Sequence, residues 1–303
     1  MSNFVVEVKE LFKVYDDFIA LDRINFNVRQ GEIFGILGPN GAGKTTTLEC
    51  LEGLRDPDGG SLLVGGIDPT SDFRNLRNQI GVQLQSAGLP ESITPDEAMK
   101  FFCAYHGVDP RFDLLDRFGL AQKRRSQFIE LSTGQQRRLT LALALAHEPR
   151  IIFMDEPTAG LDVATRIELH EMMHALKEDQ RTIIFATHDM AEAEQMADRV
   201  AILLRGRIEK IGTPMEITAT GTGLTKISVK TQGKSLHEIE FPAVNQYTTK
   251  EDYDIYFSSN IIRTIAAIIS HIENNDDLLI DLRVQRPSLE DRFLEITGKE
   301  VIE

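Results

Sequence analysis

Short stretches in which hydrophobic and polar residues alternate open the chain. Residues 5–9 follow the two-residue period of a strand, and residues 24–29 follow it again, which predicts an antiparallel pair. Residues 61–64 form another short stretch of this kind. Further along, residues 200–204 and 207–211 predict a second antiparallel pair.

Continuous apolar runs separate these stretches. Residues 33–37, 151–154 and 182–186 are apolar throughout or nearly so, which is typical of strands buried on both faces of a sheet. Residues 166–180 predict a helix between the last two runs, and residues 94–148 are expected to be mostly helical. The pattern therefore predicts an α/β core that is interrupted by a helical block.

The last part of the chain differs in character. Residues 218–223 are small and show no periodicity, so they predict a linker. Beyond them we expect a small α+β domain, which divides the chain into residues 1–217 and 218–303. Its predicted elements are strands at 226–231, 253–258 and 278–284, and a helix with a stripe formed by Ile261, Ile265, Ile268, Ile269 and Ile272.

The composition is that of an ordinary globular protein. Of the 303 residues, 42% are hydrophobic and 26% are charged, and the net charge of −14 argues against broad nucleic-acid binding. Two cysteines, Cys50 and Cys103, are too few for a disulfide framework or a zinc site and favour a reduced, cytoplasmic setting. No apolar run reaches the roughly 20 residues of a membrane span, and no secretion signal is visible. We therefore expect any role at a membrane to depend on a partner.

The segment after the first apolar run fits the pattern Gly-x-x-x-x-Gly-Lys-Ser/Thr of a loop that binds nucleotide phosphates. Its glycines let the backbone wrap an anion, and the helix predicted directly afterwards adds the partial positive charge of its N-terminus. Lys44 would reach the outer phosphates, and the Thr45 hydroxyl would bind a magnesium ion. The alternative is a glycine-rich turn without a ligand. The loop consists of Gly38, Pro39, Asn40, Gly41, Ala42, Gly43, Lys44, Thr45 and Thr46.

A second apolar run ends in two adjacent carboxylates, Asp155 and Glu156. Open α/β sheets bind their ligands beyond the carboxyl ends of the strands, so this pair is expected at the ligand edge. Asp155 is suited to hold magnesium, in part through water, and Glu156 to polarise an attacking water as general base. The alternative is a strand that ends in a solvated acidic pair.

Residues 131–138, Leu-Ser-Thr-Gly-Gln-Gln-Arg-Arg, resemble the Leu-Ser-Gly-Gly-Gln signature of ABC ATPases. They stand a short way before the aspartate strand, as in that family. Ser132 followed by helix-forming residues is also a plain helix N-cap. Thr133 replaces the glycine of the family pattern, and a β-branched residue rarely adopts positive φ, so ordinary backbone angles are expected there. Ser132 and Gly134, which would touch phosphate, are both present.

Further positions match marks of the same family. Tyr15 resembles the aromatic residue that stacks on adenine, and Gln85 resembles the glutamine at the junction of core and helical subdomain. His188 resembles the histidine that contacts the γ-phosphate, and residues 159–162 resemble the segment that crosses to the partner subunit. Each has a structural alternative: core packing for Tyr15, a solvated polar residue at position 85, and a capping or core histidine at 188.

The resemblance is to the ATP-binding subunits of ABC transporters, and it spans residues 4 to about 216. It implies an α/β fold with a P-loop, RecA-like ATPase core, an inserted helical subdomain at about residues 87–148 and an antiparallel β subdomain. The small C-terminal α+β domain follows. Residues 286–298 resemble the closing segment of ATPases from bacterial type-two, multidrug-export-like ABC exporters. The implied function is ATP hydrolysis that powers export of a substrate through a separate transmembrane permease.

By the same resemblance, two copies meet head to tail and sandwich two ATP molecules. Lys44 and the loop of one subunit hold an ATP, and Ser132 and Gly134 of the other subunit cap its γ-phosphate. The permease is expected to dock near residues 86–106 and to keep the protein at the inner face of the cell membrane. The residues implied to act in catalysis are Glu156, His188 and Gln85, and those implied to hold magnesium are Thr45, Gln85 and Asp155.

Two other functions compete with transport. A soluble ABC ATPase of translation usually carries two cassettes in one chain, and one of DNA maintenance carries long coiled coils; neither pattern is present, and the acidic balance disfavours both. A non-catalytic regulatory subunit would have a degenerate site. Lys44, Asp155, Glu156 and His188 are all intact, which argues against that alternative.

Overall fold

The computed structural model describes residues 4–84, 88–219 and 224–297. The chain forms two compact units, Met1–Thr213 and Pro214–Glu303. Within the described residues, the first unit contains two sheets and the second contains one, and each unit buries its own apolar side chains. No helix in the described ranges is both long enough and apolar enough to cross a membrane.

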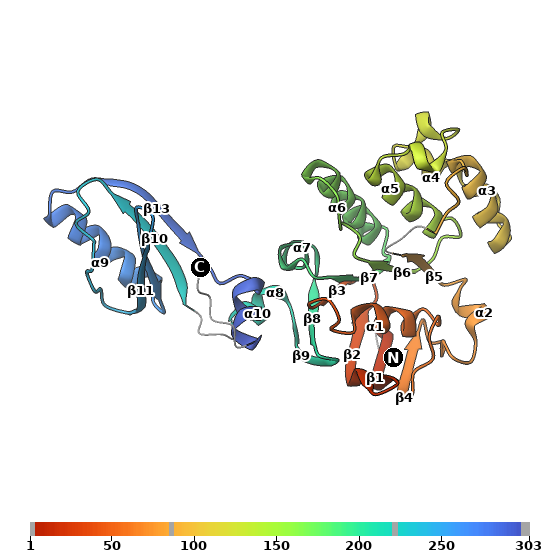
Figure 1. Cartoon of the computed structure of the whole chain (residues 1–303), viewed down its shortest axis with the longest axis horizontal. Helices are drawn as coiled ribbons and strands as arrows, with labels where there is room; N and C mark the ends of the chain where they lie inside the picture. The colour runs from red at the N-terminus through yellow and green to blue at the C-terminus, as the bar shows by residue number, and fades with distance from the viewer. Residues whose placement is uncertain (1–3, 85–87, 220–223, 298–303) are drawn as a thin grey trace. The chain divides into compact units, whose positions relative to one another are not determined.

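The first unit is built on a six-stranded sheet with the strand order β5-β6-β7-β3-β8-β9 (Figure 1). Neighbouring strands from β5 to β8 run parallel, and β9 pairs antiparallel with β8, as the sequence predicted for that hairpin. Its central strands are buried along their whole length, as their continuous apolar runs predicted. The strands are β3 (Ile33–Leu37), β5 (Ile80–Gln83), β6 (Ile151–Asp155), β7 (Thr182–Thr187), β8 (Arg199–Leu204) and β9 (Arg207–Gly212).

An antiparallel sheet of order β2-β1-β4 lies against one face of this core. β1 (Phe4–Tyr15) and β2 (Phe18–Arg29) form the predicted hairpin, and both are longer than their alternating stretches indicated. β4 is Gly59–Val64. The helix α1 (Lys44–Leu51) shares one apolar cluster with both sheets, through Leu48 and Leu51. This packing fixes the helix that follows the phosphate loop.

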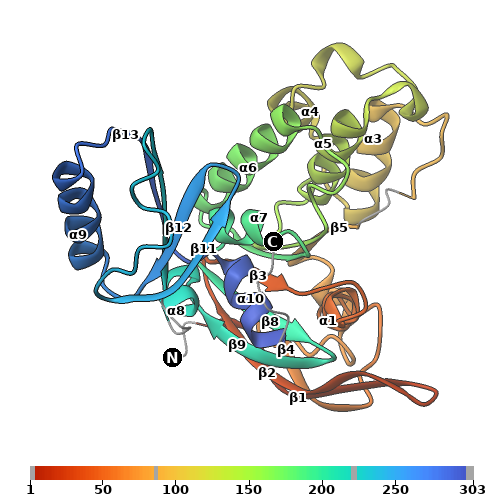
Figure 2. The same cartoon turned by 60° about the vertical axis from the view of Figure 1, so that its left-hand side comes forward.

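The helical block covers the opposite face of the six-stranded sheet. The side chains of β6 alternate between the two faces: Ile152 and Met154 contact the helices, while Ile151 and Phe153 face α1. Thr94 and Glu97 form a capping box, with Pro95 in the first turn, which fixes the start of α3. Besides α1, the helices of the unit are α2 (Phe73–Leu76), α3 (Pro95–His106), α4 (Phe112–Arg117), α5 (Thr133–Ala144), α6 (Val163–Glu178) and α7 (Met190–Met196), with short 3₁₀ turns at Ala121–Lys123 and Phe128–Glu130; α3 to α7 are labelled in Figure 2.

The second unit is a four-stranded antiparallel sheet of order β11-β12-β10-β13, with α9 packed on one face (Figures 1 and 2). Ile227, Tyr256, Ile268 and Ile272 lie in its buried cluster and Ile265 packs against it, which confirms part of the predicted stripe, whereas Ile269 is 38% exposed. α10 packs against α8. The elements are α8 (Pro214–Ala219), β10 (Thr225–Thr231), β11 (Val244–Lys250), β12 (Tyr253–Ser258), α9 (Ile261–Asn274), β13 (Leu279–Gln285) and α10 (Leu289–Thr297).

Two features of the second unit differ from the prediction. β11 was not predicted, because its sequence, Val-Asn-Gln-Tyr-Thr-Thr-Lys, is polar at most positions. Thr218 and Ala219 were placed in a linker but end the helix α8, where the Thr218 hydroxyl donates to the Pro214 carbonyl at 3.0 Å. The expected helix stop at Gly298 lies outside the described residues.

Candidate functional site

The carboxyl edge of the six-stranded sheet gathers most of the predicted site residues. β3 ends at Leu37 before the phosphate loop, β6 ends at Asp155, and β7 ends at Thr187, one residue before His188. Because these strands are parallel, their ends meet at one edge. Gln85, which follows β5, lies outside the described residues.

Two glycines of the loop are required by close packing. A Cβ atom on Gly38 would stand 2.3 Å from the carbonyl oxygen of Leu203. Gly43 caps α1 with φ +107°, a left-handed conformation, and a Cβ there would stand 2.6 Å from the Ala20 carbonyl. Gly41 also has positive φ, at +79°, but faces open space. The loop is therefore held tightly against β2 and β8 and is open at its tip.

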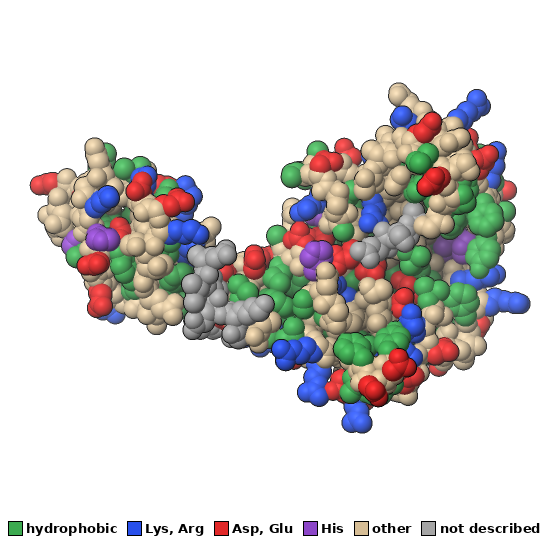
Figure 3. Space-filling view, viewed as in Figure 1, with side chains coloured by type: hydrophobic (Ala, Val, Ile, Leu, Met, Phe, Trp, Pro, Cys, Tyr) green, Lys and Arg blue, Asp and Glu red, His purple; other side chains and the backbone are tan. Residues whose placement is uncertain are grey.

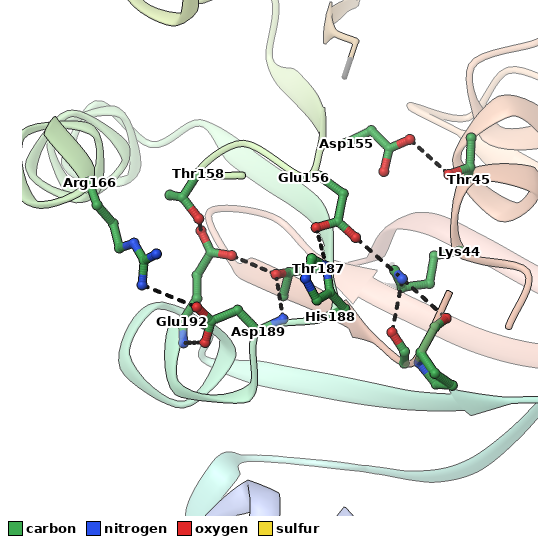
Figure 4. A network of polar contacts seen from close by, with 12 residues as sticks. Lys44, Thr45, Asp155, Glu156, Thr158, Arg166, Thr187, His188, Asp189 and Glu192 are labelled. Atoms are coloured by element: carbon green, nitrogen blue, oxygen red, sulfur yellow. Dashed lines mark hydrogen bonds and ion pairs between the residues drawn. The ribbon is translucent and has the colours of Figure 1, made fainter. Parts of the chain in front are cut away.

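Lys44 is buried at the start of α1 and points back into the loop (Figure 4). Its ammonium donates to the Gly38 carbonyl at 2.8 Å and to the Pro39 carbonyl at 3.3 Å, and its Nζ lies 3.3 Å from Oε1 of Glu156. A buried ammonium must be paired, and these three oxygens provide the pairing. The first N–H groups of α1 lack acceptors within the helix, so the loop and Lys44 together favour an anion.

Thr45 and Asp155 face each other across the edge. The Thr45 hydroxyl donates to Oδ2 of Asp155 at 2.8 Å, while the buried Oδ1 of Asp155 has no hydrogen-bond partner. Burial raises the pKa of Asp155, and the Thr45 hydrogen bond opposes the rise. The described residues contain no cluster of three or more His, Cys, Asp or Glu side chains able to hold a metal alone. A hydroxyl and an unpartnered carboxylate oxygen nevertheless suit a magnesium ion that takes its other ligands from phosphate and water.

Glu156 turns away from Asp155 because its backbone is left-handed, with φ +48°. Its Oε2 accepts a hydrogen bond from Nδ1 of His188 at 2.6 Å, and its Oε1 faces Lys44 (Figure 4). Strained backbone of this kind persists where the surrounding structure fixes it. Two neighbours in sequence therefore point to different partners, Thr45 for Asp155 and the Lys44–His188 pair for Glu156.

A buried network that sequence reasoning did not identify supports the histidine. Glu192 is 2% exposed and accepts hydrogen bonds from the hydroxyls of Thr158 at 2.7 Å and Thr187 at 2.6 Å. It thereby joins the segment after Glu156 to the segment that carries His188 (Figure 4). Asp189 caps α7 by accepting from the backbone N–H of Glu192. The spacing of Asp189 and Glu192 predicts only a capping box, which does not form here because the backbone N–H of Asp189 donates to the Thr187 hydroxyl.

Ser132 and Gly134 lie at the N-terminus of α5, apart from this network. The Ser132 side chain accepts from the backbone N–H of Gln135, so it acts as the N-cap of the helix. Within the described residues, no hydrogen bond links Ser132 to the phosphate loop. A Cβ on Gly134 would stand 2.3 Å from the Thr165 side chain. Thr133 is helical, which agrees with the expectation of ordinary backbone angles.

Tyr15 ends β1 with cations around its ring. The guanidinium of Arg55 lies 5.1 Å and the ammonium of Lys13 lies 5.6 Å from the ring centroid. Both distances are within the range of cation–π attraction.

Charged side chains of both signs are interspersed on the face shown in Figure 3, and the described residues form no broad basic patch there.

The geometry agrees with what comparison to known proteins finds. Residues 21–159 match the family model described as "ABC transporter". The chain is 33% identical over 317 residues, with full coverage of both chains, to the Nod factor export ATP-binding protein I of Burkholderia pseudomallei (strain 1710b). It is 39% identical to the probable multidrug ABC transporter ATP-binding protein YbhF of Escherichia coli (strain K12), over 71% of this chain and 38% of that protein's length.

A solved structure resembles the first unit. It is the dimeric post-hydrolysis state of the ATP-binding cassette MJ0796 bound to ADP and phosphate, with a TM-score of 0.64 and 28% identity. The likeness covers 69% of this chain and 98% of that one. It confirms the expected α/β cassette fold.

Proposed function

The chain belongs to the ABC transporter ATP-binding proteins, and from this premise we propose that it binds and hydrolyses ATP to power export through a separate transmembrane permease. The observation that carries the proposal is the arrangement at the sheet edge. There Lys44, Glu156 and His188 form one contact chain, and Thr45 and Asp155 form a second beside it. Such a pair of arrangements provides the charge and the positioning that phosphoryl transfer to water needs.

The phosphates of ATP would lie along the loop from Gly38 to Thr46. Backbone N–H groups at the start of α1 face this loop, and the ammonium of Lys44 would exchange its carbonyl acceptors for phosphate oxygens. Tyr15, with Arg55 and Lys13 beside it, would stack on the adenine. The buried position of Lys44 strengthens its attraction to phosphate, because the local dielectric is low.

Magnesium would be held by Thr45 and Asp155, together with Gln85. When bound, it would neutralise charge on the phosphates. Asp155 keeps one oxygen on the Thr45 hydroxyl and presents the other, unpartnered one. This pre-arrangement keeps the carboxylate in place before the nucleotide arrives.

Glu156 would accept a proton from the attacking water as general base. His188 donates from Nδ1 to Oε2, which orients the carboxylate, and Oε1, which faces Lys44, would accept from water once the ammonium turns to phosphate. The side chain of His188 is 54% exposed and able to contact a γ-phosphate as well. Glu192 holds the segments on either side of this pair through Thr158 and Thr187.

The active form would be a homodimer. Ser132 and Gly134 lie on the helical block and would complete the site of a second copy by capping its γ-phosphate with the N-terminus of α5. The similar cassette MJ0796 is described as dimeric, which supports this arrangement. The permease would hold the dimer at the inner face of the membrane, with its docking surface near residues 86–106.

The test compares ATP hydrolysis and ATP binding in three purified proteins. Glu156→Gln should bind ATP as the wild type does, lose at least about a hundredfold in hydrolysis, and accumulate a closed ATP-bound dimer. Lys44→Ala should lose binding. Glu91→Gln, an exposed change in the same unit, serves as the control and should leave both activities unchanged. Normal hydrolysis by Glu156→Gln would refute the assignment of the base.

The transport role needs a separate experiment. Affinity purification from detergent-solubilised membranes should recover a polytopic membrane protein with the wild-type chain. Recovery of ribosomes or DNA-repair proteins instead would favour a soluble ABC ATPase and contradict the proposal.

A further inference from the structure

Among the described residues, the C-terminal sheet ends in two edge strands of different character. β11, at one edge, carries mostly polar side chains. β13, at the other edge, exposes Leu279, Ile280 and Val284, which are 38%, 54% and 43% exposed. An exposed apolar edge strand is a site for pairing with another chain, whereas a polar edge strand is less prone to it. β13 therefore has the character of a pairing edge, and β11 does not.

We propose that β13 pairs antiparallel with β13 of a second copy of this chain, about a two-fold axis through Leu282. The proposal goes beyond the ATPase function, because it needs neither nucleotide nor the phosphate loop. Its basis is the sequence of the strand, Leu-Ile-Asp-Leu-Arg-Val-Gln, which is complementary to itself in this register.

On the face of β13 that packs towards α9, apolar side chains of the two copies would contact each other. Val284 pairs with Ile227 of β10, and Leu282 pairs with Val229, whose side chains lie in the core under α9. In the proposed register, Leu282 would lie opposite the partner's Leu282, and Val284 would lie beside the partner's bulged Ile280. The two buried cores would become continuous across the axis, which is how cross-strand apolar pairs stabilise a sheet.

On the opposite face of β13, charged side chains of the two copies would form ion pairs. Asp281 accepts from Arg283 at 2.7 Å and from the Tyr253 hydroxyl at 2.7 Å within one chain. The proposed register places Asp281 across from the partner's Arg283, and Arg283 across from the partner's Asp281. Two ion pairs would then become a ring of four alternating charges.

The charges also decide among the neighbouring registers. An axis through Asp281 would set the two aspartates opposite each other, and an axis through Arg283 would do the same with the arginines. Like charges directly opposite destabilise a strand pair. A shift by one residue in pairing would instead put the apolar side chains on the solvent face. From Asp281 to Gln285 the strand pairs regularly with β10, and the bulge at Ile280 precedes this part.

A charge exchange tests the pairing in the full chain, without nucleotide and with EDTA present. Sedimentation velocity over a concentration series should find the wild type in a monomer–dimer equilibrium. Asp281→Arg and Arg283→Asp should each weaken dimerisation by about tenfold or more, because like charges would then face each other. The double variant D281R/R283D should restore it, since the complementarity returns. Gln246→Arg, on the other edge strand, is the matched control and should dimerise as the wild type does.

Disulfide trapping tests the register independently. Cys50 and Cys103 are fully buried, so an added cysteine is the reactive one. Leu282→Cys should form a disulfide-linked dimer on mild oxidation, because residues directly opposite in an antiparallel pair have Cα atoms about 4.5–5.5 Å apart. Val284→Cys should not, because its counterpart would lie four residues away along the strand.

Either experiment can overturn the inference. A wild type that stays monomeric without nucleotide, or single charge variants that dimerise like the wild type, would do so. So would crosslinking of Val284→Cys in preference to Leu282→Cys. Lys44→Ala should pair as the wild type does, so failure of the ATPase proposal leaves this result unaffected.

Discussion

Glu52 follows α1 with its carboxyl group inside the protein, where only 3% of the residue is exposed. Burial, followed by the charges of Asp155 and Glu49, raises the pKa of Glu52 from 4.5 to about 8. Replacement by glutamine keeps the shape of the protonated carboxyl and removes its ability to ionise. Glu52→Gln should therefore stabilise the first unit at neutral and alkaline pH.

The size of the effect follows from proton linkage. Between the unfolded pKa near 4.5 and the folded pKa near 8, the folded chain holds a proton that the unfolded chain has lost. Stability is then fully present below the lower value and falls as the pH rises towards the upper one. The difference between Glu52→Gln and the wild type should grow from about 1 kcal/mol at pH 5 to about 3 kcal/mol at pH 7 and about 5 kcal/mol at pH 8.5.

Urea denaturation at these three pH values measures the difference, and thermal unfolding provides a second readout. At about 2–4 °C per kcal/mol for a unit of this size, the gain at pH 7 corresponds to roughly 6–12 °C in Tm. Glu91→Gln, an exposed change, is the control and should stay within about 0.5 kcal/mol of the wild type at every pH. A Glu52→Gln gain that does not depend on pH, or a loss of stability at pH 8.5, would refute the reasoning.

Two further predictions concern the support of the site. Glu192→Ala removes the acceptor of the buried Thr158 and Thr187 hydroxyls and should cost about 2–4 kcal/mol in urea unfolding, with a lower rate of ATP hydrolysis. Glu192→Gln keeps one acceptor oxygen and should lose less stability. Equal stability of Glu192→Ala and the wild type would contradict the role of Glu192 as acceptor for the two hydroxyls. Gly43→Ala meets both a positive φ and the Ala20 carbonyl, so it should destabilise by at least about 3 kcal/mol in the same assay. Gly41→Ala has open space around its Cβ and should cost only the backbone strain of about 1–2 kcal/mol, so equal losses for the two variants would be inconsistent with the packing argument.

The parts of the fold that the sequence predicted have a hydrophobic pattern that fits only one kind of secondary structure. β3, β6 and β7 are apolar throughout and buried throughout. β11 was missed because an edge strand needs only its backbone to pair, and a polar sequence gives no periodic signal. α8 was not predicted, because six residues are too few to show a helical period and its last two, Thr218 and Ala219, were placed in a linker.

The candidate site shows the same division. The loop and the acidic pair were predicted at the sheet edge because each lies at the end of a buried strand, and His188 was predicted from its resemblance to the family's histidine. The left-handed backbone of Glu156 was not predicted, because a glutamate after a buried strand carries no sequence signal for positive φ. Glu192 was also not assigned a role. Its partner Thr158 is distant in sequence, and a threonine such as Thr187 gives no sequence signal of a buried hydrogen bond.

The ion pair between Lys44 and Glu156 bears on the order of events in the proposed ATP hydrolysis. While the ammonium lies 3.3 Å from Oε1 of Glu156, that oxygen is engaged and is not available to accept a hydrogen bond from water. A water near Glu156 is then poorly activated until phosphate oxygens draw the ammonium away. Arrival of the nucleotide would thus switch on the group that later attacks it through water, and the resting protein would be protected from acting too early.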